Sequence, residues 1–278
     1  MSNTQYTSQD GLKKEVSLEK AIMETKENTF SKIILSKSVP NNSVTVKKQT
    51  IGARIGNAAD EGSRVAAGTK AKRTSIENTQ AIYTDLIQIS RTASKVDPNG
   101  ASAEVQAAIL GYQNWLEKMV LKGEKTTNRT TKGLIDFVPT TNKADVTGEV
   151  TGIKLSAALK PLTARADLVV CGYGAALKLD ELLKQREIDG NWYGFNGKID
   201  FISVRNAEAY VIVSDQMDDD KALFLNTNFL ERDYIDNAIT RKLDENEYDG
   251  TQYKIIEESC AMYLMPNALG LVTFKEQE

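Results

Sequence analysis

Few residues in this chain have side chains that could carry catalysis. Histidine is absent, so no Ser-His-Asp triad, Cys-His pair or histidine-based zinc site can exist. A general base would have to be a carboxylate, a lysine or a tyrosine. The two cysteines, Cys171 and Cys260, lie far apart in apolar segments. That placement is typical of small buried residues in a reduced protein, and it predicts neither a nucleophile nor a disulfide framework.

One segment has part of a nucleotide-binding pattern. In "DLVVCGYGAALKLDELL", Gly172 and Gly174 stand between an apolar strand and a helix, as in a dinucleotide-binding turn. The complete pattern needs a third small residue, and Leu177 occupies that position. No credible strand–helix–strand repeat follows. We therefore expect an ordinary strand-to-helix turn, and an enzyme with a nucleotide at Gly172–Gly174 is kept as the less favoured alternative.

Two acidic groups could attract a cation. They are "DQMDDDK", which begins at Asp215, and "DENEYDG", which begins at Asp244. Neither has the alternating ligands and the central glycine of a calcium loop. Acidic surface turns are the simpler interpretation, so the sequence predicts no metal and no cofactor. Because no catalytic constellation remains, we expect a protein that is not an enzyme.

Charge is distributed unevenly along a chain whose formal net charge is only −3. Between Val44 and Ser75, seven Lys and Arg residues face two acidic ones, an excess of five positive charges. From Arg205 to Glu278, seven basic residues face sixteen acidic ones, a net of −9. Opposite fields favour contact and set register, so the basic segment of one copy could lie on the body of another. A solvated charged surface without a partner is the alternative interpretation.

The first eighty residues show little capacity to form a core. Residues 1–50 are predicted to form a polar arm, with a short helix near residues 17–26 and extended chain around Pro40. Residues 51–80 hold four glycines among small and charged residues, and a segment of that composition cannot bury much apolar area. The N-terminus has no signal-peptide pattern, and no run approaches the ~20 apolar residues that span a bilayer. We therefore expect synthesis in the cytoplasm and no membrane partner.

The clearest element is an amphipathic helix over residues 102–122. Its apolar residues recur every three or four positions from Val105 to Met119. Ser102 can cap its start and Gly123 can end it. Before it, residues 78–96 ("NTQAIYTDLIQISRTASKV") carry much apolar surface without proline or glycine.

A mixture of strands and helices follows this helix. "GLIDFVPTT" is predicted to be a short strand, and "GAALKLDELLKQREIDG" a helix that ends at Gly190. Further strands are expected at "DLVVC", "KIDFISV", "AYVIVSD" and "KALFLNT". The C-terminal tail is predicted to form two strands, with a break at Pro266. This alternation indicates a compact α/β or α+β unit over residues 140–225.

The order of these parts resembles the major capsid protein of tailed double-stranded DNA bacteriophages, which has the Hong Kong 97-type fold. The motifs that carry the resemblance are "KENTF" at residues 26–30, the "NTQAIYTDLIQISRTASKV" segment, and "NWLEKMVLKGE" followed by "NRTTKGLIDF". The resemblance implies an α+β, Hong Kong 97-like capsid fold. Its parts would be an N-terminal arm (1–50), an extended loop (51–80), a peripheral domain (81–139) with the spine helix (102–122), an axial domain (140–225), and a return to the peripheral domain (226–278). Residues 78–96 would pack on the spine helix.

The resemblance also implies a function. The chain would be a structural protein that self-assembles into the icosahedral phage head enclosing the double-stranded DNA genome. Its partners would be copies of itself in pentamers and hexamers, portal and scaffolding proteins, and DNA held on the inner face without sequence specificity. It would assemble in the host bacterial cytoplasm and be found in the virion. An encapsulin-like compartment, or another virion component such as a tail protein, is the alternative.

The extended loop supplies the residues expected at contacts between subunits. These are its basic side chains, Arg54, Arg64, Lys70, Lys72 and Arg73. Some relatives join a loop lysine covalently to an asparagine of a neighbouring subunit. Lys70 and Lys72 lie in the matching region, but the sequence identifies neither the partner nor a catalytic carboxylate, so that chemistry is not carried over to this chain.

Overall fold

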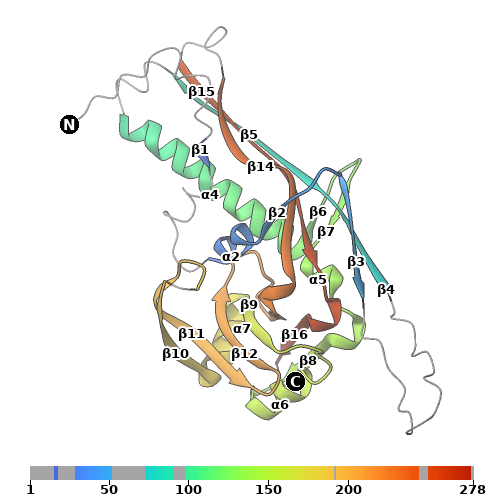
Figure 1. The fold of residues 1–278 in the computed structure, drawn as a ribbon. Helices are drawn as coiled ribbons and strands as arrows, with labels where there is room; N and C mark the ends of the chain where they lie inside the picture. Colours follow the sequence, from blue (N-terminus) through green and yellow to red (C-terminus); the bar gives the residue numbers. More distant parts are fainter. Residues whose placement is uncertain are drawn as a thin grey trace, which may run out of the picture.

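The computed structural model describes residues 16–17, 29–51, 73–90, 98–190, 192–243 and 250–276. Within these ranges the chain forms two main sheets, and a long helix, α4 (Pro98–Lys122), runs beside the first of them (Figure 1). No helix in these ranges has both the length and the apolar character needed to cross a bilayer.

The first sheet is built from long antiparallel strands. These are β5 (Ala81–Ser90), β14 (Leu230–Leu243) and β15 (Gly250–Tyr263), and β15 lies between the other two. Two short strands, β1 (Val16–Ser17) and β2 (Ser38–Pro40), both pair with β14. Helix α2 (Phe30–Ser36) precedes β2 and is buried almost along its whole length.

Helix α4 packs on one face of this sheet. Ile87 and Ile89 of β5 lie in the same buried cluster as Tyr112 and Leu116 of α4. Alternate residues of a strand point to opposite faces, so only one set of β5 side chains can reach the helix. The packing agrees with the expectation that residues 78–96 lie against this helix, although residues 91–97 fall outside the described part.

Two small hairpins flank the first sheet. β3 (Thr45–Ile51) pairs with β4 (Arg73–Thr79), and the pair forms a ribbon that projects from the body (Figure 1). β6 (Gly123–Lys125) pairs with β7 (Thr130–Lys132) directly after α4. A short helix, α5 (Leu134–Phe137), and a 3-10 turn, η2 (Thr140–Asn142), lead into the second sheet.

The second sheet has seven strands in the order β10-β11-β12-β9-β13-β16-β8. In chain order the strands are β8 (Lys143–Thr147), β9 (Ala166–Cys171), β10 (Leu183–Asp189), β11 (Asn196–Val204), β12 (Ala207–Val213), β13 (Lys221–Leu225) and β16 (Gly270–Lys275). Helices α6 (Gly152–Ala158) and α7 (Tyr173–Leu179) accompany them, with 3-10 turns η3 (Asp180–Leu182), η4 (Thr227–Phe229) and η6 (Pro266–Ala268).

The central strand β9 shows how the core is divided. Leu168 and Val170 point into a cluster shared with α2, α4 and the first sheet. Val169 and Cys171 point the other way, into a second cluster with α6 and α7. A strand covered on both faces reads as a continuous apolar run, which explains "DLVVC". The two main sheets therefore share a continuous core.

The long helix ends where the sequence predicts. Gly123 follows it with a φ of +77°, and a Cβ at that position would lie 2.2 Å from the carbonyl oxygen of Thr131. Both facts require glycine, since a left-handed residue in close contact cannot carry a side chain. The helix begins at Pro98, four residues before the expected start, and proline is well suited to the first helical position.

Two predicted elements are wrong. The helix expected to reach Gly190 ends at Leu179, and residues 183–189 form β10 instead. β10 pairs with β11 along its whole length, from Leu183 opposite Ile202 to Asp189 opposite Asn196, and this ladder overrides the local helical preference. "GLIDFVPTT" forms α5 and a 3-10 turn rather than a strand, with the carboxylate of Asp136 accepting a hydrogen bond from the amide of Gly133.

The last strand also differs from the expectation. Residues 226–278 were expected to return to the peripheral domain, and β14 and β15 do lie in the first sheet. β16, however, pairs with β13 and β8 in the second sheet. Turn η6 redirects the chain, and β16 then buries Leu271, Val272 and Phe274. Of the helix expected near residues 17–26, Ser17 lies in β1 and pairs with β14, and residues 18–26 lie outside the described part.

Candidate assembly interface

The β3–β4 ribbon is fixed to the body by a charged contact at β3. The ammonium group of Lys48 lies 2.8 Å from Asp233 Oδ1 and also contacts Glu231, both on β14. Asp233 is almost completely buried. Burial lowers the pKa of Lys48, but the hydrogen bonds to the two carboxylates outweigh it, so the pKa lies above its usual 10.5. Lys48 therefore holds β3 on the first sheet as a cation.

The second strand of the ribbon is anchored by the buried amide of Asn78. Its Nδ2 donates to the carbonyl oxygens of Lys132 at 2.9 Å and Ala261 at 2.7 Å. Its Oδ1 accepts from the backbone amides of Lys132 at 2.8 Å and Thr79 at 2.9 Å. Because every hydrogen-bonding group of this amide has a partner, the base of the ribbon has a defined orientation.

These two anchors fix the position of the ribbon, and therefore of Ile51 and Arg73, which flank residues 52–72. Ile51 and Arg73 pair at the outer end of the ribbon, and Arg73 is exposed. Of the residues expected at subunit contacts, Arg73 is the one that lies in the described part. Arg54, Arg64, Lys70 and Lys72 belong to residues 52–72, which lie outside it, so their contacts stay a prediction.

The first sheet contains a buried ion pair that could not be predicted from the sequence. Arg232 of β14 and Glu257 of β15 are both completely buried, 2.9 Å apart between Nη1 and Oε1. The hydroxyl groups of Tyr112 and Ser259 donate to Glu257, and Arg232 donates to Ser38 Oγ at 2.9 Å. The cluster thus joins β14, β15, α4 and β2. Both strands hold several charged residues, so nothing in the sequence marks Arg232 and Glu257 as a buried pair.

A second buried carboxylate connects α2 and the second sheet to the long helix α4. Glu117, in the C-terminal part of α4, accepts hydrogen bonds from the amide of Ser31 at 3.1 Å and from the hydroxyl of Ser214 at 2.7 Å. Ser31 belongs to α2, and Ser214 directly follows β12. One side chain therefore holds α2 and the second sheet on the long helix.

The loop of residues 214–220 continues this connection. Asp218 lies 2.5 Å from the ammonium group of Lys122 at the end of α4 and 2.6 Å from that of Lys221. The hydrogen bond from Lys122, followed by that from Lys221, lowers the pKa of the Asp218 carboxyl below 3.8. This loop belongs to the acidic group "DQMDDDK", in which Asp218 contacts two lysines of the same chain. In the described part of the chain, no three Cys, Asp or Glu side chains gather as metal ligands would.

The glycines of the turn after β9 have a structural explanation. A Cβ on Gly172 would lie 2.2 Å from the carbonyl oxygen of Asp218, and one on Gly174 would lie 2.6 Å from Asp219 Oδ2. The amide of Gly174 donates to Asp219 Oδ1 at 2.7 Å. The amide that would bind a phosphate therefore already holds a carboxylate of the same chain. This geometry argues against the nucleotide-binding alternative.

The two thiols are not reactive groups. Cys171 and Cys260 are completely buried. Burial raises the pKa of both thiols to about 12, and the nearby carboxylates of Asp200 and Asp233 add to the effect. A thiol with such a pKa carries almost no thiolate at neutral pH. The other acidic group, residues 244–249, lies outside the described residues.

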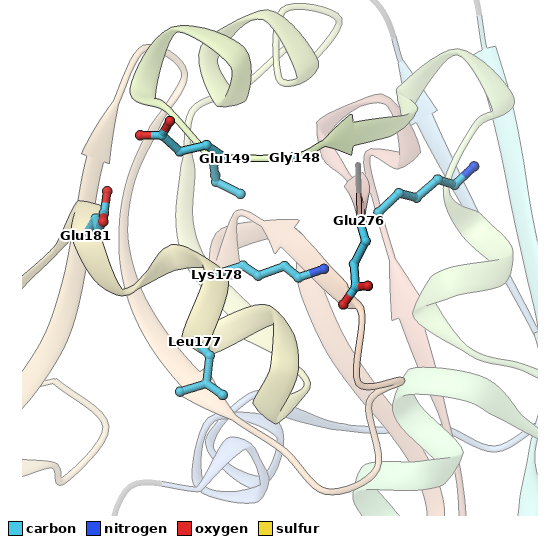
Figure 2. Close-up of a pocket in the computed structure, with 8 residues that line it drawn as sticks. Gly148, Glu149, Leu177, Lys178, Glu181 and Glu276 are labelled. Atoms are coloured by element: carbon cyan, nitrogen blue, oxygen red, sulfur yellow. The ribbon is translucent and has the colours of Figure 1, made fainter. Parts of the chain in front are cut away.

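An open pocket of about 360 Å³ lies beside α7 (Figure 2). Leu177, Lys178 and Glu181 line it from one side, and the end of β16 with Glu276 lines it from the other. The loop after β8, including Glu149, completes the lining. The pocket belongs to the outer, helix-covered side of the second sheet.

Comparison with known proteins places the chain in a family. Residues 2–275 match the family described as SU10 major capsid protein. No curated protein matches the sequence. Because the match spans almost the whole chain, it concerns the complete fold rather than a single motif.

Solved structures share this fold at low sequence identity. A chain of the satellite phage P4 procapsid that includes the size determination (Sid) protein has a TM-score of 0.61 and 13% identity, covering 100% of this chain and 94% of that one. A chain of Microbacterium phage Oxtober96 has a TM-score of 0.61 and 11% identity, covering 87% and 90%. The holo-SrpI encapsulin complex from Synechococcus elongatus PCC 7942 has a TM-score of 0.59 and 12% identity, covering 85% and 84%.

The likeness to these structures shows the fold alone, and an encapsulin shares it with the phage proteins. It confirms the expected α+β, Hong Kong 97-type architecture. The family match separates the two functions, because it names a phage capsid protein. The chain therefore belongs to the SU10 major capsid protein family, and it is a structural, non-enzymatic protein of a bacteriophage capsid.

Proposed function

We propose that this chain assembles with copies of itself into pentamers and hexamers that close an icosahedral head around double-stranded DNA. The family match over residues 2–275 is the observation that carries the proposal. Identical heterologous contacts that close into rings can build such a shell from one chain. Each contact can then be modest, because many of them act together.

The domains have separate roles in this proposal. Residues 81–139, together with β14 and β15, form the peripheral domain, and residues 140–225 form the axial domain that gathers around the five-fold and six-fold axes. β16 joins the axial sheet. The arm of residues 1–50 and the loop of residues 51–80 add contact area on neighbouring copies. The shared core and the contacts of Glu117 support this arrangement, because they hold the two main sheets as one rigid subunit.

The basic side chains of the loop make the contacts to neighbours. These are Arg54, Arg64, Lys70, Lys72 and Arg73. The excess of positive charge between Val44 and Ser75 and the acidic C-terminal third support this, since complementary fields set register between copies. The buried contacts of Lys48 and Asn78 support it too, because they direct the ribbon that leads into this segment.

Further partners follow from the same proposal. The subunit assembles in the host bacterial cytoplasm with scaffolding and portal proteins, and the completed head becomes part of the virion. DNA lies on the inner face without sequence recognition. The nearly neutral chain supports this, because a container with few uncompensated cations does not bind its genome tightly.

Electron microscopy of the purified chain tests the proposal. Expressed in bacteria and concentrated, the wild-type chain should form closed particles with five-fold and six-fold clusters. Heads isolated from infected cells should protect double-stranded DNA from nuclease. A stable monomer at every concentration and salt condition would contradict the assembly. Particles that enclose a protein cargo and never DNA would favour the encapsulin-like alternative.

A further inference from the structure

Strand β5 forms an edge of the first sheet. All ten of its residues pair with β15, and within the described chain no strand pairs with its other side. The amide of Leu86 donates to Asp85 Oδ1 at 2.8 Å, so it points away from β15. Because the backbone groups of an antiparallel strand alternate in direction, those of Ile82 and Thr84 point to the same free side. The outer side of β5 therefore offers unpaired amide and carbonyl groups to a further strand.

The residues of this edge do little to protect it. Natural edge strands are usually shielded by proline, by lysine or by several charged side chains. β5 contains neither proline nor lysine, and Asp85 is its one charged residue. Ile82 and Leu86, on the face of the strand opposite to α4, are 48% and 47% exposed. An exposed apolar edge of this length is typical of a site for strand addition.

A small pocket lies at the beginning of this edge. Its volume is about 180 Å³, and Ile82 lines it together with residues of the β6–β7 hairpin, including Arg129 and Thr131. Thr131 is almost completely buried, and its hydroxyl has no hydrogen-bond partner in the described part of the chain. A buried hydroxyl without a partner is costly, so the pocket is suited to a polar side chain from another molecule.

The sequence of β5 is complementary to itself in one antiparallel register. With Thr84 opposite Thr84 of a second copy, Ile82 of each copy lies opposite Leu86 of the other. The exposed apolar side chains then cover one another, and Asp85 lies opposite Tyr83. Moving the centre to residue 85 would place two aspartates directly opposite each other, which is unfavourable. The register centred on Thr84 is therefore the favoured one.

The same register places a polar side chain at the pocket. Gln88 is exposed and lies on the same face of β5 as Ile82 and Leu86. Along the second copy it follows two residues after Leu86, so it reaches the beginning of β5 and the pocket lined by Thr131. The amide of glutamine both donates and accepts hydrogen bonds, so it can satisfy the buried hydroxyl.

We propose that β5 pairs with β5 of a second copy across a two-fold axis, with Thr84 at the centre and Gln88 of each copy in the pocket at Thr131 of the other. Rings of five and six must also be joined to one another, and a contact across a two-fold axis uses the same surface of both copies. A self-complementary edge meets that requirement. The inference rests on the proposed self-assembly and deepens it, because it names a surface that joins neighbouring rings.

Cysteine cross-linking at the centre of the pairing tests it. Opposite residues of a hydrogen-bonded antiparallel pair have Cα atoms about 5.5 Å apart, a separation that a disulfide can span. Thr84 is exposed, and the Thr84→Cys variant should give a disulfide-linked dimer on a non-reducing gel after mild oxidation. The matched control is Gln88→Cys on the same face, because the two copies of residue 88 would lie about 26 Å apart, too far for a disulfide. The native cysteines are buried, so they do not compete.

Charge at the same position gives a second, independent readout. Thr84→Lys and Thr84→Glu each place two like charges opposite each other, and each should lower particle yield about fivefold. An equal mixture of the two variants should give at least about twice the yield of either alone, because lysine can then face glutamate. Since Thr84 is exposed, circular dichroism should show an unchanged subunit. A mixture that yields no more than either variant would overturn the pairing at Thr84.

The outcomes separate this inference from the proposed function. Normal particles without the Thr84→Cys dimer would overturn the pairing and leave the shell standing. The dimer without particles under any condition would support the pairing and overturn the shell. Equal amounts of dimer from Thr84→Cys and Gln88→Cys would mean undirected collision and would also overturn the pairing. Neither dimer nor particles would overturn both.

Discussion

Asp219 and Gly174 are joined by a hydrogen bond of 2.7 Å between the carboxylate of the β12–β13 loop and the amide at the start of α7. The neighbouring Asp218 is held by Lys122 at the end of α4. The β12–β13 loop thus connects α4, which packs on the first sheet, to α7, which covers the second sheet.

The close approach at Gly172 predicts a strong effect of a single methyl group. Gly172→Ala places a Cβ 2.2 Å from the carbonyl oxygen of Asp218, a contact with backbone that cannot move without displacing the loop. We expect a loss of about 2–3 kcal/mol in the free energy of unfolding, measured by urea denaturation.

Gly111→Ala is the matched control. Gly111 lies inside α4, and its Cβ would meet only Tyr83 Oη at 3.8 Å. Alanine there should be neutral or stabilise by up to about 1 kcal/mol, because it favours the helix. Equal effects at the two glycines would contradict the steric explanation.

The anchor of the ribbon predicts a difference between two adjacent lysines. Lys48→Met leaves the buried Asp233 without its cation, and we expect the free energy of unfolding to fall by about 3 kcal/mol. Lys47→Met removes only an exposed pair with Glu77, 3.2 Å long, and should cost less than about 1 kcal/mol. Chemical denaturation of both variants measures the difference. A similar cost for the two would mean that the buried contact does not anchor β3.

The hydroxyl of Tyr112 should contribute to stability through the buried cluster. Tyr112→Phe removes a hydrogen bond to the completely buried Glu257, so we expect a loss of about 1–3 kcal/mol in urea denaturation. The same substitution at the exposed Tyr173 should change stability by less than about 0.5 kcal/mol. If Tyr112→Phe is as stable as wild type, the hydroxyl is not required to satisfy Glu257.

Asp218 predicts a pH-dependent contribution. Its pKa is lowered in the folded chain, so the folded state binds its proton less readily than the unfolded state does. The contribution is therefore present above pH 3.8 and is lost as the pH falls below 3.8 through the folded pKa. Asp218→Asn should be less stable than wild type at pH 7, and the difference should shrink below pH 3.8.

Urea denaturation between pH 2.5 and pH 7 measures this difference. Asp215→Asn, in the same loop, is a matched control because no ion pair of Asp215 is present in the described structure. A constant gap between wild type and Asp218→Asn over the whole range would show that the ion pairs of Asp218 are not its source.

The sequence predicted the elements whose signals are local. The end of α4 follows from Gly123, and the buried run at β9 and the break at Pro266 follow from apolar and turn residues. β10 was missed because its residues favour a helix and become a strand only by pairing with β11. The sheet that receives β16 was missed for the same reason: strand partners are chosen by contacts far apart in the chain.

In the candidate site too, features with a local sequence signal were predicted, and features formed by distant segments were not. The sequence marked the basic segment, of which Arg73 lies in the described part, and the acidic loop at Asp215. It gave no indication of Arg232 with Glu257, or of Glu117 with Ser214, because these pairs meet only after β14, β15 and α4 have packed. Residue type alone does not separate a buried charge from a solvated one. The pocket at α7 likewise combines three glutamates from three separate segments.

The role of the extended loop can be tested by removing it at the ends that the structure defines. Ile51 and Arg73 are paired across the ribbon, so replacing residues 52–72 by Asn-Gly closes β3 and β4 with a two-residue turn. The buried contacts of Lys48 and Asn78 remain, and the subunit should keep its folding free energy to within about 1 kcal/mol, since loop length affects stability only weakly. Shells should be absent by electron microscopy, because the deletion removes the contacts proposed with neighbours. Normal particles from a folded deletion variant would show that β3, β4 and the sheet edges suffice for assembly, and the basic segment would then have no part in it.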